Sequence, residues 1–312
     1  MRILIVGRKS MYNAEYFYQK AFRDNGDDVL FVDSYTDVNH QLVNRQIHTR
    51  TEKFNVLLKH YWINKNLLRI VDGYDPNIVI VFKGEFILNS TIEQISQNRN
   101  IYLFYPDTYK FRPLLENRLQ YFKKVFTAAN RTDFYYNLGA KDVVTIPWAC
   151  DPEFHKKLNV KKSMDVSFIG TAYPERRRII RQIKDVDVFG DFWYGFRNAH
   201  KPVHGEDFIE TINRSSINLN LQAKISVDAD APTMRTFEMA GCGAFQISDY
   251  MESLKKYFPM LPTFKTITEL KELINYYKNN TDDRNTIGEK SMALCYKFFK
   301  YTDAARMIIS KL

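Results

Sequence analysis

Hydrophobic and polar residues in the first half of the chain follow two alternating patterns. Short apolar runs rich in β-branched residues, such as Arg2–Val6 and Ile78–Phe82, are typical of strands buried on both faces of a parallel sheet. Between them, Ala14–Asn25 places apolar side chains at helical spacing, and Asn25-Gly26 would end that helix. Because strands and helices alternate, the pattern predicts a parallel, doubly wound α/β sheet.

The same patterns continue to the end of the chain. We expect further strands at Val29–Val32, Ile101–Tyr105, Lys124–Thr127, Val143–Ile146, Val166–Ile169, Val186–Phe189, Ile217–Leu221 and Ala244–Ile247. We expect further helices at about Val43–Val71, Thr91–Gln97, Leu114–Tyr121, Thr132–Leu138, Arg177–Ile183, Asp207–Asn213, Thr233–Ala240, Met251–Tyr257, Ile267–Lys278 and Thr286–Leu312. Pro147–Pro152 interrupts the alternation, so we place a domain junction there. A chain of 312 residues suits two domains of about 150 residues each.

Composition narrows the class of protein. The formal net charge is +9, which suits an anionic partner such as a phosphorylated substrate, an anionic membrane or a nucleic acid. The aromatic residues follow the apolar periodicity, and Arg176–Arg178 with Arg181 form the dense basic cluster, so we expect no nucleic acid. No apolar run approaches a membrane span, and the N-terminal run is too short for a signal peptide. Three sparse cysteines fit the cytoplasmic location that we therefore expect.

The stretch from Asp230 to Gly243 carries the strongest signal for a site. Pro232 and Thr233 would open a helix after a strand, and free amides at such a helix start suit phosphate. Arg235 and Glu238 are three residues apart and share a face. The arginine could bind a diphosphate, and the carboxylate could accept hydrogen bonds from two ribose hydroxyls. A surface Arg–Glu pair beside a glycine-capped helix remains the alternative interpretation.

A second stretch, Gly170 to Arg178, follows another predicted strand. Its glycine would allow a ligand to approach the backbone closely. Three arginines would then begin a helix, where the helix dipole disfavours cations, and this indicates an anionic ligand. Pairing of these arginines with Glu175 and solvent is the alternative interpretation. The stretch lacks the Lys-Ser/Thr end of a Walker loop.

Acidic residues after strands are the candidates for catalysis. Asp107 follows a strand and could act as a general base, although an acidic turn residue explains it as well. Asp230 lies on the loop before the helix and could meet the sugar. Asp228-Ala-Asp230 is formally a D-x-D motif, but such matches are common by chance, so we expect no metal ion. The six histidines show no zinc-ligand spacing.

An ordered set of motifs resembles one family. The set comprises Phe168–Arg176, Gly190–Trp193, Ile217–Asn220 and Arg235–Asp249, with Asp75–Val81, Tyr105–Asp107, Phe126–Asn130 and Leu138–Pro147 in the first half and Lys297–Leu312 at the end. In this order the motifs resemble the glycosyltransferases related to spore maturation protein CgeB. The resemblance covers nearly the whole chain, and it implies the GT-B fold, in which two Rossmann-like domains with parallel sheets face each other across a cleft.

The resemblance also implies a role for each part of the chain. Residues 1–150 would bind the acceptor, residues 151–290 the nucleotide-sugar donor, and residues 291–312 would form a helix that packs back on the first domain. The expected donor-binding residues are Gly170, Tyr173, Arg176, Trp193, Asn220, Thr233, Arg235 and Glu238, and the expected catalytic residues are Asp107 and Asp230. Related retaining enzymes have Glu where Asp230 stands, so retention and inversion both stay open, with Asp107 as the base of an inverting enzyme.

The expected activity is metal-independent transfer of a hexose-type sugar from a nucleoside diphosphate donor, without any further cofactor. The acceptor would be a glycan, a lipid-linked molecule, a protein or a cell-surface component, and peripheral contact with the inner face of the membrane is left open. Three alternatives remain: a sugar-nucleotide epimerase on the same fold, a metal-dependent D-x-D enzyme, and a non-catalytic module that binds an anion or a nucleic acid.

Overall fold

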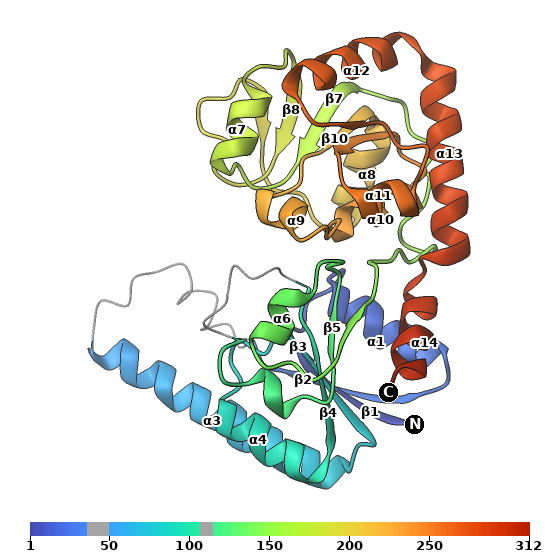
Figure 1. Ribbon diagram of the computed structural model, residues 1–312. Coiled ribbons are helices and arrows are strands. Elements are labelled where there is room, and N and C mark those ends of the chain that lie inside the picture. Colours follow the sequence, from blue (N-terminus) through green and yellow to red (C-terminus); the bar gives the residue numbers. More distant parts are fainter. Residues whose placement is uncertain (36–49, 107–114) are drawn as a thin grey trace. The chain divides into compact units, whose positions relative to one another are not determined.

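The computed structural model describes residues 1–35, 50–106 and 115–312, except for the side chains of residues 50–57 and 59. The chain divides into two compact units, labelled by element in Figure 1. Unit 1 comprises Met1–Ile146 and Ala305–Leu312, and unit 2 comprises Pro147–Ala304. Each unit contains a six-stranded sheet whose paired strands run parallel. The predicted α/β class with two parallel sheets is confirmed.

The sheet of unit 1 has the strand order β2-β1-β3-β4-β5-β6. Its strands are β1 (Arg2–Gly7), β2 (Asp28–Asp33), β3 (Ile78–Phe82), β4 (Asn100–Phe104), β5 (Val125–Thr127) and β6 (Val143–Thr145). Its helices are α1 (Ala14–Asp24), α3 (Arg50–Tyr74), α4 (Asn89–Asn98), the 3₁₀ helix η2 (Leu119–Tyr121), α6 (Asp133–Asn137) and the C-terminal residues of α14 (Tyr301–Ser310).

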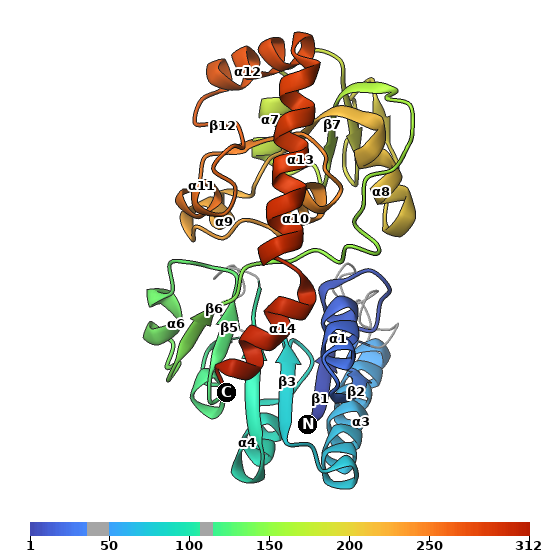
Figure 2. The ribbon, with the colours of Figure 1, turned by 90° about the vertical axis from the view of Figure 1, so that its right-hand side faces the viewer.

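Alternate side chains of the strands in unit 1 pack on opposite faces of the sheet. Leu4 and Val6 join the buried cluster that contains Leu67 and Val71 of α3. On the other face, Tyr18 of α1 packs against aromatic rings of β3 and β4, with ring centroids 5.5 and 5.0 Å away. Figures 1 and 2 show α1 and α14 on one side of this sheet and α3 and α4 on the other. Both faces are therefore covered, as the continuous apolar runs predicted.

The sheet of unit 2 has the strand order β12-β11-β10-β7-β8-β9. Its strands are β7 (Met164–Ile169), β8 (Val186–Phe189), β9 (Ala199–His200), β10 (Ser215–Asn220), β11 (Gln246–Asp249) and β12 (Thr263–Phe264). Its helices are α7 (Pro174–Ile180), α8 (Gly205–Arg214), α9 (Lys224–Asp228), α10 (Met234–Gly241), α11 (Glu252–Tyr257), α12 (Ile267–Asn279) and α13 (Thr281–Phe298), followed by the first residues of α14.

Three free thiols lie in the interior of unit 2. Cys150, Cys242 and Cys295 are each at most 1% exposed. Burial, together with the neighbouring thiol of Cys150, raises the pKa of Cys295. A Cβ atom at Gly241 would lie only 2.9 Å from the Cβ of Cys150, so α10 packs tightly against the segment that begins unit 2. These thiols are structural, buried groups.

Two helix predictions are wrong in their extent. In the described part of the predicted helix Leu114–Tyr121, Leu115 is helical, residues 116–118 form a turn, and the 3₁₀ helix η2 follows. Asn117 has a φ of 59° there, which an α-helix does not accommodate. The predicted helix Thr286–Leu312 is two helices, α13 and α14. The break falls where Cys150 donates its N–H to the Phe299 carbonyl and accepts from the Tyr301 N–H, so a backbone bridge replaces helical bonds.

The start of α7 also differs from the prediction. Pro174 occupies its first turn, beside Glu175, and the helix ends at Ile180. Arg177 and Arg178 consequently lie in the last turn, where cations complement the helix dipole. Arg177 and Arg178 therefore do not oppose the dipole, whereas Arg176, the third residue of α7, lies in its first turn. The position of each guanidinium group decides whether it can bind an anion.

Candidate functional site

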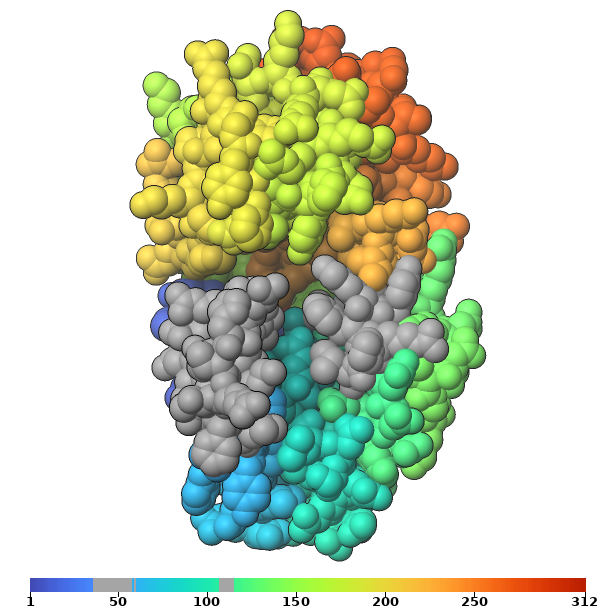
Figure 3. Space-filling view, turned by 90° about the vertical axis from the view of Figure 1, so that its left-hand side faces the viewer, coloured from blue at the N-terminus to red at the C-terminus, as the bar shows by residue number. Residues whose placement is uncertain are grey.

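The strand order of unit 2 creates a switch point between β7 and β10. Chain connections leave these two neighbouring strands toward opposite edges of the sheet, to β8 on one side and to β11 on the other. In open α/β sheets, ligands bind beyond the carboxyl ends of the strands at such a point. Gly170 follows β7, and Leu221 follows β10. Figure 3 shows one face of the molecule, on which residues 170–200, in yellow-green, cover part of unit 2.

Arg176 spans this switch point. It belongs to α7, which follows β7, yet its Nε and Nη2 atoms donate to the Leu221 carbonyl beyond β10, at 3.1 and 2.8 Å. Its guanidinium carbon lies 5.2 Å from the ring centroid of Phe168 and 5.1 Å from that of Tyr173. Burial, and next the charge of Arg235, lower the pKa of Arg176 to about 10. The side chain is thus fixed between two rings and two strand ends.

Arg235 converges on the same place from α10. A Cβ atom added to Gly170 would lie 3.3 Å from Nη1 of Arg176 and 3.3 Å from Nη1 of Arg235. Burial lowers the pKa of Arg235, opposed by the charge of Glu238. Within the described part of the chain, the buried Nε of Arg235 has no hydrogen-bond partner. Two guanidinium groups beside a side-chain-free position are chemically suited to an anion.

Close backbone packing holds Gly170 in position. Trp193 is buried and donates its indole N–H to the Gly170 carbonyl at 2.7 Å. At Gly190, a Cβ atom would lie 2.3 Å from the same carbonyl oxygen. Any residue with a side chain at this position would therefore push the ends of β7 and β8 apart. Trp193, which we expected to bind the donor, therefore contacts the backbone of the site and is 3% exposed.

A network of amide side chains supports the start of α10. The side chain of Asn220 donates to Thr236 Oγ1 and to Gln246 Oε1, both at 2.8 Å, and accepts from Gln222 Nε2 at 3.0 Å. Gln222 Oε1 in turn accepts from the N–H of Thr233, the N-cap residue of α10, at 3.3 Å. The hydroxyl of Thr233 makes no capping hydrogen bond. Asn220, through Thr236 and Gln222, thus helps to hold the N-terminus of α10 in place.

Glu238 is buried beside a histidine. Its side chain lies one turn after Arg235 on α10, and the residue is 5% exposed. His155 Nδ1 accepts from the Asp151 N–H at 2.9 Å, so the neutral imidazole carries its hydrogen on Nε2. That Nε2 lies 3.6 Å from Glu238 Oε1. Little of the Glu238 carboxylate is therefore open to solvent or to a ligand.

The two carboxylates of the D-x-D motif have different surroundings. Asp228 is exposed at the end of α9, whereas Asp230 is 6% exposed and has a φ of 49°. The Asp230 carboxylate accepts from the N–H of Ser253 at 3.1 Å and from its hydroxyl at 2.8 Å, which satisfies the start of α11. Among the described residues, no group of three or more His, Cys, Asp or Glu side chains is placed to hold a metal ion.

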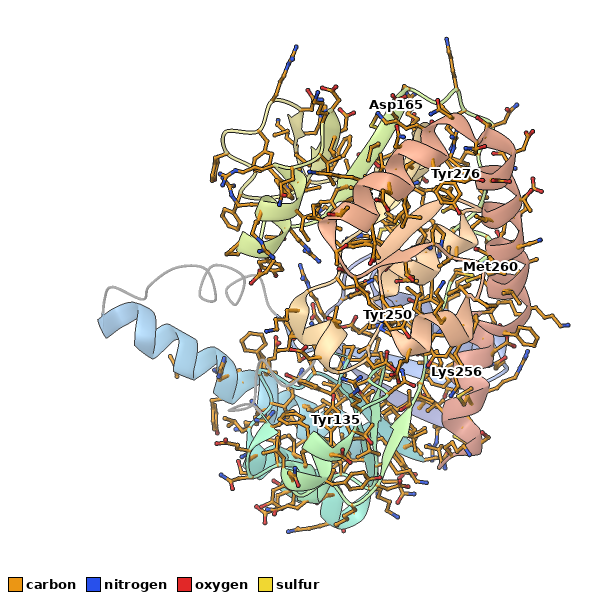
Figure 4. The ribbon with its side chains drawn as sticks, turned by 45° about the horizontal axis from the view of Figure 1, so that its top comes forward. Tyr135, Asp165, Tyr250, Lys256, Met260 and Tyr276 are labelled. Carbon is orange, nitrogen blue, oxygen red and sulfur yellow. The ribbon has the colours of Figure 1, made fainter. Side chains whose placement is uncertain are left out.

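Another acidic residue lies at the same edge of the sheet, where we named no site residue. Asp249 ends β11, and its Oδ2 accepts from the Gln222 N–H at 2.6 Å. Burial raises the pKa of Asp249 to about 6, opposed by that hydrogen bond and by the charge of Arg176. Tyr250, labelled in Figure 4, follows it, and Lys265 Nζ lies 4.2 Å from its ring centroid.

Unit 1 has a buried carboxylate at the corresponding edge of its own sheet. Glu15, in the first turn of α1, is 7% exposed, and a Cβ atom at Gly7 would lie 3.0 Å from its Cγ. Burial raises the pKa of Glu15, against hydrogen bonding and the charge of Lys83. Neither Glu15 nor His155 was among the expected site residues, because no local motif marks them. Asp107 lies outside the described residues.

Of the expected donor residues, the structure brings four to the switch point. Gly170, Arg176 and Arg235 meet directly, and Tyr173 stacks on Arg176 while remaining 40% exposed. The other four expected donor residues are Trp193, Asn220, Thr233 and Glu238. Their side chains or backbone groups make the contacts within unit 2 that are described above. The arrangement provides localised positive charge with close backbone access, which suits a phosphate or diphosphate group.

The chain is similar to several known proteins. Residues 169–310 match a family model described as glycosyl transferase-like. Among solved structures, the sucrose-phosphate synthase of Thermosynechococcus elongatus superposes with a TM-score of 0.69 at 10% identity, covering 99% of this chain and 98% of that one. HepE of Anabaena in complex with UDP and glucose has a TM-score of 0.69 at 12% identity, covering 100% and 99%. A glycosyltransferase from Rickettsia africae has a TM-score of 0.65 at 11% identity, covering 99% and 97%.

No significant match is found among curated protein sequences. The relationship to the CgeB-related enzymes stays a prediction, because the matching family model has a broader description. At identities near 10% the structural likeness establishes the fold. The chain thus has the GT-B fold, and its residues 169–310 match the glycosyl transferase-like family, which together support a glycosyltransferase.

Proposed function

We propose that this protein transfers a hexose-type sugar from a nucleoside diphosphate donor to a glycan, a lipid-linked molecule, a protein or a cell-surface component. The convergence of Arg176 and Arg235 beside Gly170 carries the proposal, because two fixed cations with a free approach fit a diphosphate. Structures with the same fold contain UDP and UDP-glucose, which supports a nucleotide-sugar as the donor.

The reaction requires charge stabilisation at the leaving group. The acceptor hydroxyl oxygen forms a bond to the anomeric carbon of the sugar, and the bond from that carbon to the diphosphate breaks. The diphosphate leaves with the electron pair, and Arg176 and Arg235 stabilise its charge, so we propose that no metal ion is needed. The hydroxyl proton passes to a base, for which Asp107 remains our candidate.

The remaining residues have proposed supporting roles. Glu238 accepts hydrogen bonds from the ribose hydroxyls, and Tyr173 lies beside the diphosphate. Asp230 approaches the sugar from the loop before α10, where Ser253 holds its carboxylate. We propose a cytoplasmic protein that contacts the inner face of the membrane peripherally, where a lipid-linked acceptor would be found. None of the helices in the described ranges is long and apolar enough to cross a membrane.

A thermal-shift screen tests the donor. UDP, GDP, dTDP, CMP and their sugars are added separately, and a true donor raises the melting temperature by mass action. Arg235→Ala should lower the affinity for that ligand by about 10- to 100-fold, the value of a charge-assisted hydrogen bond. Arg178→Ala is the matched control, because Arg178 is exposed on α7. If no nucleotide stabilises the chain, or if both variants bind equally, the proposal is wrong.

An epimerase is the second candidate. A putative UDP-N-acetylglucosamine 2-epimerase from Listeria monocytogenes superposes with a TM-score of 0.58 at 10% identity, covering 99% of this chain and 95% of that one. An epimerase converts its donor without an acceptor. NMR of the donor incubated with the protein alone separates the two activities, since a transferase leaves the sugar configuration unchanged in that sample.

A further inference from the structure

Among the described side chains of α3, three large apolar ones are exposed together. Leu58 is 40% exposed, Tyr61 53% and Trp62 56%. Positions 58, 61 and 62 lie on one face of the helix, because residues three and four apart are neighbours. Asn64, Leu67 and Val71 point the other way and are buried in unit 1. Single exposed apolar residues are ordinary, but two aromatic residues and a leucine within two turns form a patch.

Basic side chains extend the same face. Lys65 Nζ lies 5.6 Å from the ring centroids of both Tyr61 and Trp62. Arg69, one turn further, is exposed. From Leu58 to Val71 the sequence contains Lys59, Lys65 and Arg69 but no Asp or Glu. We call Leu58, Tyr61, Trp62, Lys65 and Arg69 the α3 surface; it is apolar toward the N-terminus of the helix and cationic beyond.

Helix α3 reaches the surface of unit 1. Figure 1 shows the N-terminal half of this helix extending beyond the sheet of unit 1. In Figure 3 the blue residues of α3 lie at the surface of the face shown. Aromatic residues with lysine and arginine on one helical face are the combination that binds at a lipid–water interface.

We propose that the α3 surface binds an anionic lipid bilayer. Tyr61 and Trp62 insert at the level of the headgroups together with Leu58, and Lys65 and Arg69 attract anionic lipids. Lys65 and Arg69 supply the charge complementarity, and the exposed Asp72, three residues after Arg69, marks where the cationic part of the surface ends. The use of this contact to reach a lipid-linked acceptor rests on the proposed function, whereas the contact itself depends on α3 alone.

Tryptophan fluorescence offers a direct test. Of the three tryptophans, Trp62 is exposed, whereas Trp148 and Trp193 are 9% and 3% exposed. The full-length chain is mixed with vesicles of phosphatidylcholine and phosphatidylglycerol, or of phosphatidylcholine alone. We expect co-sedimentation and a blue shift of the emission with the anionic vesicles, weakened by salt. In Trp62→Phe the blue shift should disappear.

A matched pair of variants localises the contact. Trp62→Ala and Lys65→Glu should each reduce sedimentation with anionic vesicles by about tenfold or more. Phe298→Ala and Lys297→Glu are the controls, because Phe298 is 55% exposed on α13 and Lys297 Nζ lies 5.0 Å from its ring. Nucleotide-induced thermal shifts should be the same in all four variants, so failure of membrane binding and failure of the proposed function are distinguishable.

Four results would overturn the proposal. The first is binding to phosphatidylcholine alone that equals binding to anionic vesicles. The second is equal loss of binding in the α3 and α13 variants. The third is a large drop in melting temperature for Trp62→Ala, which would show that Trp62 packs inside the protein in solution. The fourth is concentration-dependent dimerisation that Trp62→Ala abolishes, which would assign the surface to a second copy of the chain.

Discussion

Arg176 and Arg235 reach Gly170 from two different helices, and Nη1 of each would lie 3.3 Å from a Cβ atom at that position. Each arginine is partly or fully buried, and the charge of Arg235 contributes to the lowered pKa of Arg176. Two like charges held together in this way favour an anion between them, because the anion would offset both their repulsion and their lost hydration.

The first prediction concerns Gly170→Ala. The new methyl group would meet Phe168 Cζ at 3.0 Å and the ends of both arginines, which can shift by a few tenths of an ångström. We therefore expect a loss of stability of only about 1 kcal/mol, from the φ of 157°, but a loss of diphosphate affinity of at least tenfold. Calorimetric titration with the nucleoside diphosphate found in the thermal-shift screen measures the second effect.

Gly195→Ala provides the control for this experiment. Gly195 has a φ of 79°, yet nothing lies within 4 Å of an added Cβ atom. It should show a comparable loss of stability and unchanged nucleotide affinity. Equal affinities for the two variants would show that the space beside Gly170 is not where the ligand binds.

The second prediction concerns the ribose. If the Glu238 carboxylate accepts from the ribose hydroxyls, the wild-type protein should prefer the nucleoside diphosphate found in the thermal-shift screen over its 2′-deoxy form by about tenfold, the value of one hydrogen bond to a charged group. Glu238→Gln should reduce this preference to near unity while retaining part of the diphosphate affinity. Competition binding with both nucleotides measures it, and an unchanged preference in the variant would remove Glu238 from the ribose site.

The third prediction separates two roles of Asp230. Because its carboxylate satisfies the N-terminus of α11 through Ser253, Asp230→Ala should lower the free energy of unfolding by about 1–2 kcal/mol. Ser253→Ala removes only the hydroxyl contact, so it should lower the free energy of unfolding by less than Asp230→Ala does. If Asp230 also acts at the sugar, Asp230→Ala should reduce kcat far more than Ser253→Ala does, at a temperature where both are folded. Equal kcat values would leave Asp230 with the structural role alone.

The fourth prediction concerns pH. Because burial raises the pKa of Asp249 from 3.8 to about 6, the folded chain keeps a proton that the unfolded chain loses above about pH 4. The free energy of unfolding should therefore fall by about 1–3 kcal/mol between pH 4 and pH 6 and then level off.

Glu15, whose pKa is also raised, contributes with the same sign. The difference in the free energy of unfolding between wild type and Asp249→Asn isolates the contribution of Asp249. The amide oxygen of the substituted side chain would still accept the Gln222 hydrogen bond, but it would not titrate. Urea unfolding at several pH values measures it. A difference that stays constant from pH 4 to pH 7 would contradict the shifted pKa.

The architecture was largely predictable because apolar runs with sharp ends determine buried strands. The predicted strands Ile78–Phe82 and Val186–Phe189 agree with β3 and β8 to the residue, since Asp75-Pro76 and Gly190 bound them. β9 and β12 were not predicted, because strands of two residues produce no detectable period.

The candidate site was predictable in part. Arg235 and Arg176 were expected because strand ends followed by helices mark such sites, whatever fold contains them. The histidine beside Glu238 was not expected, because His155 lies 83 positions away and only folding brings the two together, to 3.6 Å. Asn220 shows the converse: a polar residue after a strand suggests a ligand contact, but its amide is used by Thr236 and Gln246.

The distribution of cysteines has an experimental consequence. The three thiols belong to unit 2 and are shielded from solvent, whereas unit 1 contains no cysteine. An alkylating reagent will therefore modify the protein only when the second half of the fold opens, and the rate of modification reports that opening without any engineered label. Adding a nucleotide should slow the modification if it binds there, which makes the native cysteines a built-in assay of ligand protection.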